Sequence, residues 1–289
     1  MPDNNILKNI KKLRELTGVG FKDCKLAIEE NNGDIEKSIE FLRKKGIAKA
    51  SKKMSRTASE GLALVSEKNG EISLIEVNSE TDFVAKNKDF VDFCKELSNI
   101  NFDNKGDLSK INKAKMKNSI TVEENLINLI SKIGEKITIR RASFFDKSNG
   151  KNYFYVHSSQ EKNIGKIISI VKLNTNNKGK IDDDLGLKIA MHIAASNPLS
   201  IDKHDLNKEI IEKEEEIIKE ELKNSGKKGE IIEKISTGKL NKFIEDNTLN
   251  NQAWIIDPKK KVSQVLKEDN SEGALKVIDF VRYKVGEGV

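Results

Sequence analysis

The sequence contains few of the residues from which reactive or cross-linked sites are built. Its 289 residues include only two cysteines and three histidines. Cys24 and Cys94 lie far apart, each on an expected apolar helix face, which favours two reduced core thiols over a disulfide or a metal pair. The motifs GxxxxGK(S/T), HExxH and CxxC are all absent. We therefore expect no metal site and no cofactor.

Long apolar runs are also missing. No run approaches the roughly 20 residues that a membrane-spanning helix needs, and the N-terminal residues contain no apolar signal core. Hydrophobic residues make up 36% of the chain and charged residues 34%, which is enough for compact cores with solvated faces. We therefore expect a cytoplasmic protein that does not associate with membranes.

Excess positive charge is confined to one short stretch. Seven lysines and arginines lie from Arg43 to Arg56 with no acidic residue among them, and their summed positive charge exceeds the net charge of +6. The rest of the fold therefore lacks a basic groove. Because no aromatic residues are available for base stacking, the stretch favours a solvated linker at residues 47–60, and no specific nucleic acid is expected. The alternative is an RNA- or ribosome-associated accessory protein that uses residues 43–56.

Residues 1–46 have the pattern of a three-helix domain, with apolar residues three and four apart. The first helix is expected to end at Gly18-Val19-Gly20, and Asp23 and Asp34 are expected to cap the second and third. Gly46 is expected to end the third helix. A bundle of this size is more typical of a binding module than of a catalytic domain.

After the linker, the pattern indicates an α+β core with antiparallel sheets. A first unit, residues 61–147, begins with two strands around Asn69-Gly70, which is a strong hairpin signal. A second unit, residues 148–289, repeats this order of elements, with one strand expected over 164–173 and a later one near 253–256. The core is thus expected to be duplicated in element order rather than in residue identity.

The second unit contains a different segment at about residues 205–247. Pairs of isoleucines at 210–211 and 217–218 are seven residues apart among Glu and Lys, and a second helix follows the turn at 224–229. We expect an antiparallel coiled-coil hairpin. Its apolar seam is narrow, so it is expected to project from the body as an arm.

No combination of residues indicates a reaction centre. Gly18-Val19-Gly20 joins two expected helices and therefore lacks the strand-to-helix context of a dinucleotide fingerprint. His192 lies on an apolar helix and is interpreted as a core or interface residue, whereas His157 ends a strand and is more open to a contact. The acidic run 182–184 suits a helix N-terminus. We therefore expect a binding protein and not an enzyme.

The segment from 78 to 87, NSETDFVAKN, lies where a strand ends and a helix begins. One interpretation is structural: Ser79 or Thr81 caps the helix, while Phe83 and Val84 dock in the core. The other interpretation is functional. Asp82 and Phe83 stand outward on a rigid corner, and a carboxylate beside an aromatic wedge enters the cleft of a partner.

Several blocks of the sequence resemble the elongation factor Ts family. TDFVAKN is similar to the family's signature, and residues 13–46 are similar to its ubiquitin-associated-like domain. KIGEKITIRR, MHIAASNP and RYKVGEGV resemble further blocks in the family's order, so the resemblance covers essentially the whole chain. It implies a helical N-terminal domain, a duplicated α+β core, an inserted coiled-coil hairpin, and guanine-nucleotide exchange on elongation factor Tu.

The resemblance also implies which residues contact elongation factor Tu in its GDP-bound and nucleotide-free forms. The family's corner enters the GTPase domain and disturbs the Mg²⁺ site and the phosphates, and its counterparts here are Thr81, Asp82, Phe83 and Val84. Further contacts are implied for Arg14, Val19 and Phe21 in the N-terminal domain, for Ile133 and Gly134 near the phosphate-binding loop, and for His157. Many members continue past the RYKVGEGV block into another helix, so we expect weaker binding here or binding carried by the arm.

Overall fold

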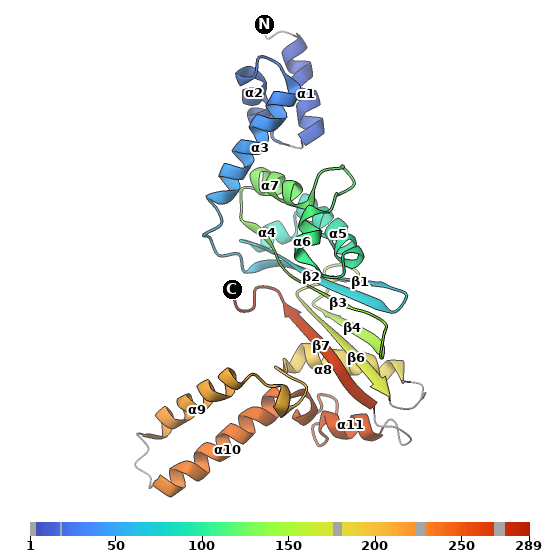
Figure 1. Cartoon of the computed structure of the whole chain (residues 1–289), viewed down its shortest axis with the longest axis vertical. Coiled ribbons are helices and arrows are strands. Elements are labelled where there is room, and N and C mark those ends of the chain that lie inside the picture. Colours follow the sequence, from blue (N-terminus) through green and yellow to red (C-terminus); the bar gives the residue numbers. More distant parts are fainter. Residues whose placement is uncertain (1–3, 18, 176–180, 224–228, 269–274) are drawn as a thin grey trace.

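The computed structural model describes the chain except residues 1–3, 18, 176–180, 224–228 and 269–274. It is an α+β structure with antiparallel sheets (Figure 1). The described helices are α1 (Asn4–Thr17), α2 (Phe21–Glu30), α3 (Ile35–Ser51), α4 (Asp82–Ala85), α5 (Lys88–Asp103), α6 (Leu108–Lys113), α7 (Val122–Ile133), α8 (Asp183–Ser196), α9 (Lys208–Lys223), α10 (Gly229–Asn247) and α11 (Val262–Glu268). The described strands are β1 (Glu60–Lys68), β2 (Glu71–Ser79), β3 (Ile137–Phe145), β4 (Lys151–His157), β5 (Ile164–Gly165), β6 (Ile167–Thr175) and β7 (Leu275–Lys284). None of these helices combines the length and the apolar character needed to cross a membrane.

Helices α1, α2 and α3 form the N-terminal bundle around a small apolar core. The prediction that Asp34 caps α3 is confirmed, because its carboxylate accepts the N–H of Lys37 at 3.0 Å. The prediction that Asp23 caps α2 is wrong, because α2 begins earlier and Asp23 lies in its first turn. There its carboxylate binds Lys45 and Lys49 of α3 at 3.0 and 2.9 Å, which holds the two helices together.

Helix α3 runs past its predicted end at Gly46 and continues to Ser51. Gly46 is instead a point at which α3 approaches α7. A Cβ added there would lie 3.1 Å from Cγ2 of Ile127, so a larger side chain would push the two helices apart. The bundle is therefore joined to the core by a continuous helix, and the connection is shorter than the expected linker at 47–60.

Two antiparallel sheets form the centre of the molecule. The first has the strand order β3-β2-β1-β5 and the second the order β4-β6-β7. The predicted hairpin at Asn69-Gly70 is confirmed, since both residues have positive φ and β1 pairs with β2 along its whole length. The sheets pack face to face through an apolar cluster that includes Val65, Leu74, Ile168 and Ile170.

Helices cover the outer face of each sheet (Figure 1). Helices α5, α6 and α7 pack on the first sheet with side chains such as Phe90 and Ile111. Helices α8 and α11 pack on the second with side chains such as Ile189 and Leu266. The core is therefore layered as helices, sheet, sheet, helices.

The two sheets share a pairing order. In each, a pair of strands is followed by helices and then by a strand that returns beside the second of the pair, so that β3 lies against β2 and β7 against β6. Both of these pairings contain an irregularity of register, at Glu76/Val77 and at Lys172/Leu173. This common order supports the proposed duplication.

Two predictions for the second unit are wrong. Residues 253–256 form no strand, only a single bridge between Ala253 and Lys261. The strand expected over 164–173 is divided into β5 and β6, and β5 pairs with β1 of the first sheet. The boundary predicted between residues 147 and 148 therefore does not separate the two sheets, because β5 crosses from the second unit to the first.

Helices α9 and α10 extend from the second sheet as an arm (Figure 1). Their side chains meet along a seam that buries Ile218 and Leu222, and Lys239 binds Glu221 across it at 2.6 Å. The expected turn lies mostly at 224–228, outside the described residues. A projecting helical pair is thus present where it was predicted, and its coiled-coil character stays a prediction.

Candidate functional site

A one-turn helix, α4, shapes the junction between β2 and α5, and we call residues 80–86 the corner. Val84 and Ala85 are buried against the core of the first sheet, at 5% and 1% exposed. Phe83 is 79% exposed, the highest value among the exposed large hydrophobic residues of the described chain. The corner is therefore fixed on its inner side and presents an aromatic ring on its outer side.

The corner combines parts of both interpretations of the sequence. Val84 docks in the core, as the structural interpretation predicts. Phe83 does not, and Thr81 makes no capping bond to α4, because its hydroxyl donates to Glu135 instead. Successive residues of an α-helix project about 100° apart, so burying Val84 and Ala85 turns Phe83 towards solvent.

A carboxylate lies beside the exposed ring. Asp82 accepts a hydrogen bond from Lys86, one turn later, at 2.8 Å. This hydrogen bond lowers the pKa of Asp82 and raises the pKa of Lys86. Asp82 is therefore ionised at neutral pH. An exposed ring next to a fixed negative charge is suited to recognition of another protein.

The loop that follows α7 runs beside the corner. Strands β2 and β3 pair as far as Ser79 and Ile137, so the residues before β3 lie alongside those after β2. Gly134 ends α7 with φ +89° and is exposed, while Ile133 is half-buried against the core. The structure thus brings Gly134 and the corner to the same end of the first sheet.

The segment after β4 also reaches the corner. His157 ends β4, is exposed, and has its Nδ1 atom 3.3 Å from the hydroxyl of Tyr155. Gln160 donates a hydrogen bond to the carbonyl of Ala85 at 3.3 Å. Reasoning from the sequence missed Gln160, because this contact joins residues 75 positions apart and belongs to no motif.

The candidates in the N-terminal bundle belong to a different part of the molecule (Figure 1). Arg14 is exposed, and Phe21 is 47% exposed. Val19 is 8% exposed and belongs to the apolar core of the bundle. Arg14 and Phe21 are thus available to a partner directly, whereas Val19 holds the start of α2 in place.

Most basic residues between 43 and 56 bind other parts of the chain. Their partners are Glu124 for Arg43, Glu40 for Lys44, Asp23 for Lys45 and Lys49, the Gly134 carbonyl for Lys53, and Glu80 for Arg56. The Lys44 pair lies within α3, whereas the other contacts tie α3, and the segment at 52–59 that connects it to β1, to α2 and to the core. They favour a structural role for the stretch over a free basic face.

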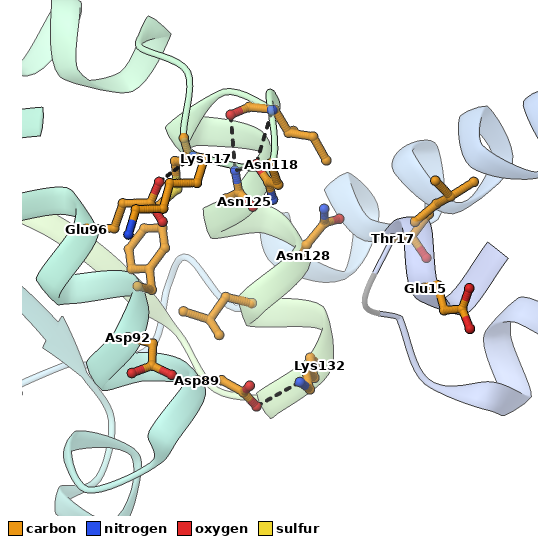
Figure 2. Close-up of a pocket in the computed structure, with 15 residues that line it drawn as sticks. Glu15, Thr17, Asp89, Asp92, Glu96, Lys117, Asn118, Asn125, Asn128 and Lys132 are labelled. Carbon is orange, nitrogen blue, oxygen red and sulfur yellow. Dashed lines mark hydrogen bonds and ion pairs between the residues drawn. The ribbon is translucent and has the colours of Figure 1, made fainter. Parts of the chain in front are cut away.

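A cleft of about 390 Å³ lies between α1 of the bundle and helices α5 and α7 (Figure 2). Two of its carboxylates have partners within it: Asp89 binds Lys132 at 2.8 Å, and Glu96 accepts the N–H of Lys117. Among the described residues, no group of three or more His, Cys, Asp or Glu side chains is placed to hold a metal ion. One ion pair and one hydrogen bond to a backbone N–H are contacts typical of an interhelical surface.

His192 is a core residue, as the sequence indicates. It is fully buried, with Nε2 2.9 Å from Oε1 of Gln252 and its ring stacked on Trp254 at a centroid distance of 5.2 Å. Burial lowers the pKa of His192, so the ring is neutral at physiological pH. The prediction for the cysteines is also confirmed, since Cys24 and Cys94 are buried free thiols.

Comparison with known proteins gives the family. A family model described as Elongation factor TS matches residues 80–287, which include the corner, Gly134 and His157. A protein named Elongation factor Ts from Rickettsia prowazekii is 42% identical over 284 residues, which cover 97% of this chain and 91% of the relative. A protein of the same name from Methylorubrum extorquens is 40% identical over 283 residues, which cover 97% of this chain and 92% of the relative. This chain therefore belongs to the elongation factor Ts family of translation elongation factors.

Proposed function

We propose that this protein is a guanine-nucleotide exchange factor that binds elongation factor Tu and promotes the release of GDP. The observation that carries the proposal is Phe83, which is 79% exposed although the next two residues are buried. An exposed large ring contributes little to folding, and a partner that covers it gains the full effect of its burial. Membership of a family of translation elongation factors supports elongation factor Tu as that partner.

The physical basis of exchange is linkage between two ligands. A GTPase holds GDP through backbone amides, a lysine and Mg²⁺. A protein that binds the nucleotide-free GTPase better than the GDP form must weaken GDP binding by the same factor. Thousandfold faster release requires a barrier about 4 kcal/mol lower. Burial of one phenylalanine side chain supplies about 1.5–3 kcal/mol, and disturbance of the Mg²⁺ site supplies the remainder.

Such a mechanism needs no acid, base or nucleophile, and we infer that the protein is not an enzyme. Phe83 acts as the wedge, with the Asp82 carboxylate beside it competing for polar groups at the Mg²⁺ and phosphate site. Thr81 supplies the backbone at the base of the wedge, and Val84 holds it in the core. We assign the remaining partner contacts to Arg14, Phe21 with Val19 behind it, Ile133 with Gly134, and His157.

The proposed assignment extends to the other parts of the chain. The N-terminal bundle acts as a ubiquitin-associated-like domain that meets the same GTPase domain. The arm of α9 and α10 acts as a coiled-coil hairpin and adds a second contact. We place the protein in the cytoplasm, where its partner works.

The test is the release of fluorescent GDP from bacterial elongation factor Tu, followed by stopped flow with excess unlabelled GDP. We expect the release rate to rise with the concentration of this protein and then to saturate, because release occurs from a bound complex. A second series at high Mg²⁺ is expected to slow the accelerated release. If a folded sample leaves the release rate unchanged at every concentration, the proposed function is wrong.

A further inference from the structure

The corner is held at the point where regular strand pairing stops. The last paired residues of β2 and β3 are Ser79 and Ile137. Beyond them the two segments of backbone separate, because β2 leads into α4 and β3 is preceded by the loop from α7. Antiparallel register places Glu80 opposite Lys136, and Thr81 opposite Glu135. In both positions a carboxylate on one segment accepts a hydrogen bond from the backbone N–H of the opposite residue.

Glu135 binds the corner with both of its carboxylate oxygens. Oε2 accepts the backbone N–H of Thr81 at 3.0 Å, and Oε1 accepts its hydroxyl at 2.8 Å. This pair of bonds fixes the backbone and the side chain of Thr81 together. It also explains why the hydroxyl does not cap α4. Hydrogen bonds to a charged acceptor are stronger than neutral ones, so the contact is suited to fix a surface segment.

Glu80 makes the reciprocal contact. Its Oε1 accepts the backbone N–H of Lys136 at 2.5 Å, and the guanidinium of Arg56 lies 3.3 Å from both oxygens. Burial acts to raise the pKa of Glu80, but the Lys136 N–H and Arg56 outweigh it and lower the pKa. The Nζ atom of Lys136 in turn donates to the carbonyls of Met54 and Arg56 at 2.8 Å. The segment that connects α3 to β1 is thus bound to Glu80 and Lys136 through Met54 and Arg56.

The position of Glu135 depends on Gly134. The residue has φ +89°, a left-handed conformation that glycine adopts without strain. It ends α7 and turns the chain back towards β3, so that the next side chain faces Thr81. No added Cβ at Gly134 would meet another atom within 4 Å, so the requirement is conformational rather than one of space.

We propose that Glu135 is a positioning residue for the wedge. Through Thr81 it fixes the direction in which α4 leaves β2, and so the direction of Phe83. Burial of Val84 and Ala85 leaves Phe83 on the solvent side of α4, and the paired hydrogen bonds to Glu135 add a directional restraint at the start of the helix, which apolar packing alone does not supply. Glu80 provides the reciprocal contact with Lys136. We call the contacts of Glu135 with Thr81 and of Glu80 with Lys136 the clamp. The inference rests on the proposed function, since the benefit of a fixed wedge is realised in the complex.

The first measurement is amide hydrogen exchange of the free protein, which requires no partner. In Glu135→Ala we expect the amides of the corner to exchange about tenfold faster or more, because two bonds to a charged group are lost. Glu135→Gln keeps an oxygen for the N–H and an amide group for the hydroxyl but loses the charge, so it is expected to restore most of the protection. Glu67→Ala, at an exposed glutamate of β1, is the matched control and is expected to change nothing.

The second measurement is stimulated GDP release by the same variants. For Glu135→Ala we expect the saturating release rate to fall about tenfold, with little change in the concentration that gives half-saturation, because the other contacts with the partner remain. If Glu135 merely stabilises the fold, Glu135→Ala should instead lower the Tm, and Glu135→Gln should be impaired in GDP release as well. Glu135→Gln is therefore the decisive comparison.

Three outcomes would overturn the clamp. These are unchanged amide exchange in Glu135→Ala, an unchanged saturating rate despite faster amide exchange, and a Glu135→Gln variant as impaired as Glu135→Ala. Failure of the unmodified protein to accelerate GDP release would be a separate result. It would remove the proposed function, while faster amide exchange in Glu135→Ala would still support the clamp in the free protein.

Discussion

Replacing Phe83 by alanine is expected to separate partner binding from folding. The ring is 79% exposed, so its removal should change the free energy of unfolding by no more than about 0.5 kcal/mol, as for most surface substitutions. In the complex the ring is proposed to be buried, and its loss removes about 1.5–3 kcal/mol. That corresponds to a release rate about 10- to 150-fold lower.

The assay pairs stopped-flow GDP release with denaturant unfolding of the same samples. Phe83→Leu keeps an apolar side chain of smaller size, so its GDP release rate should lie between those of the unmodified protein and Phe83→Ala. Phe90→Ala is the buried counterpart: Phe90 is fully buried on α5, and its truncation should cost about 3–5 kcal/mol of stability. If Phe83→Ala is destabilised like Phe90→Ala, the ring packs in the core. If Phe83→Ala is stable and promotes release like the unmodified protein, the wedge is wrong.

Three further changes test other parts of the structure. Replacing residues 208–243 by a short Gly-Ser loop should leave the Tm of the rest of the protein unchanged, because Ser200 pairs with Thr248 at the base of the arm. The same replacement should raise the concentration needed for half-maximal GDP release, because the contact proposed for the arm is lost. Glu76→Ala should lower the free energy of unfolding by about 3–5 kcal/mol in denaturant titrations, because Glu76 is a fully buried carboxylate paired with two arginines, which would lose their partner. Burial lowers the pKa of His192 below its value in the unfolded chain, so stability should fall as the pH drops below about 6.5, and His192→Gln should remove that decline.

Local patterns in the sequence were sufficient where neighbouring residues decide the structure. Asn69-Gly70 indicates a turn in which both residues need positive φ, and the structure has it. Thr121 and Glu124 form the capping box that begins α7. The seven-residue spacing of isoleucines indicated the helices of the arm. In each case the physical requirement acts within one turn of helix or one hairpin.

Predictions failed where contacts distant in the sequence decide the outcome. Gly46 ends no helix, because α7 packs against it and favours a continuous α3. The single bridge at Ala253 replaces an expected strand. The contact of Thr81 with Glu135 spans 54 positions and depends on the register of β2 and β3. No local pattern in either segment indicates that contact.

The corner illustrates how a proposed site for a partner is compatible with a stable fold. A buried Phe83 would stabilise the free protein, but it would leave nothing apolar to enter the partner. An exposed ring on a loose loop would also bind weakly, because ordering a side chain and its backbone on binding costs about 0.5–1.5 kcal/mol per side chain and more for the loop. Burial of Val84 and Ala85, together with the two hydrogen bonds that Thr81 donates to Glu135, is expected to remove that cost in advance. More of the binding free energy is then available to oppose GDP, which is what the proposed exchange function requires.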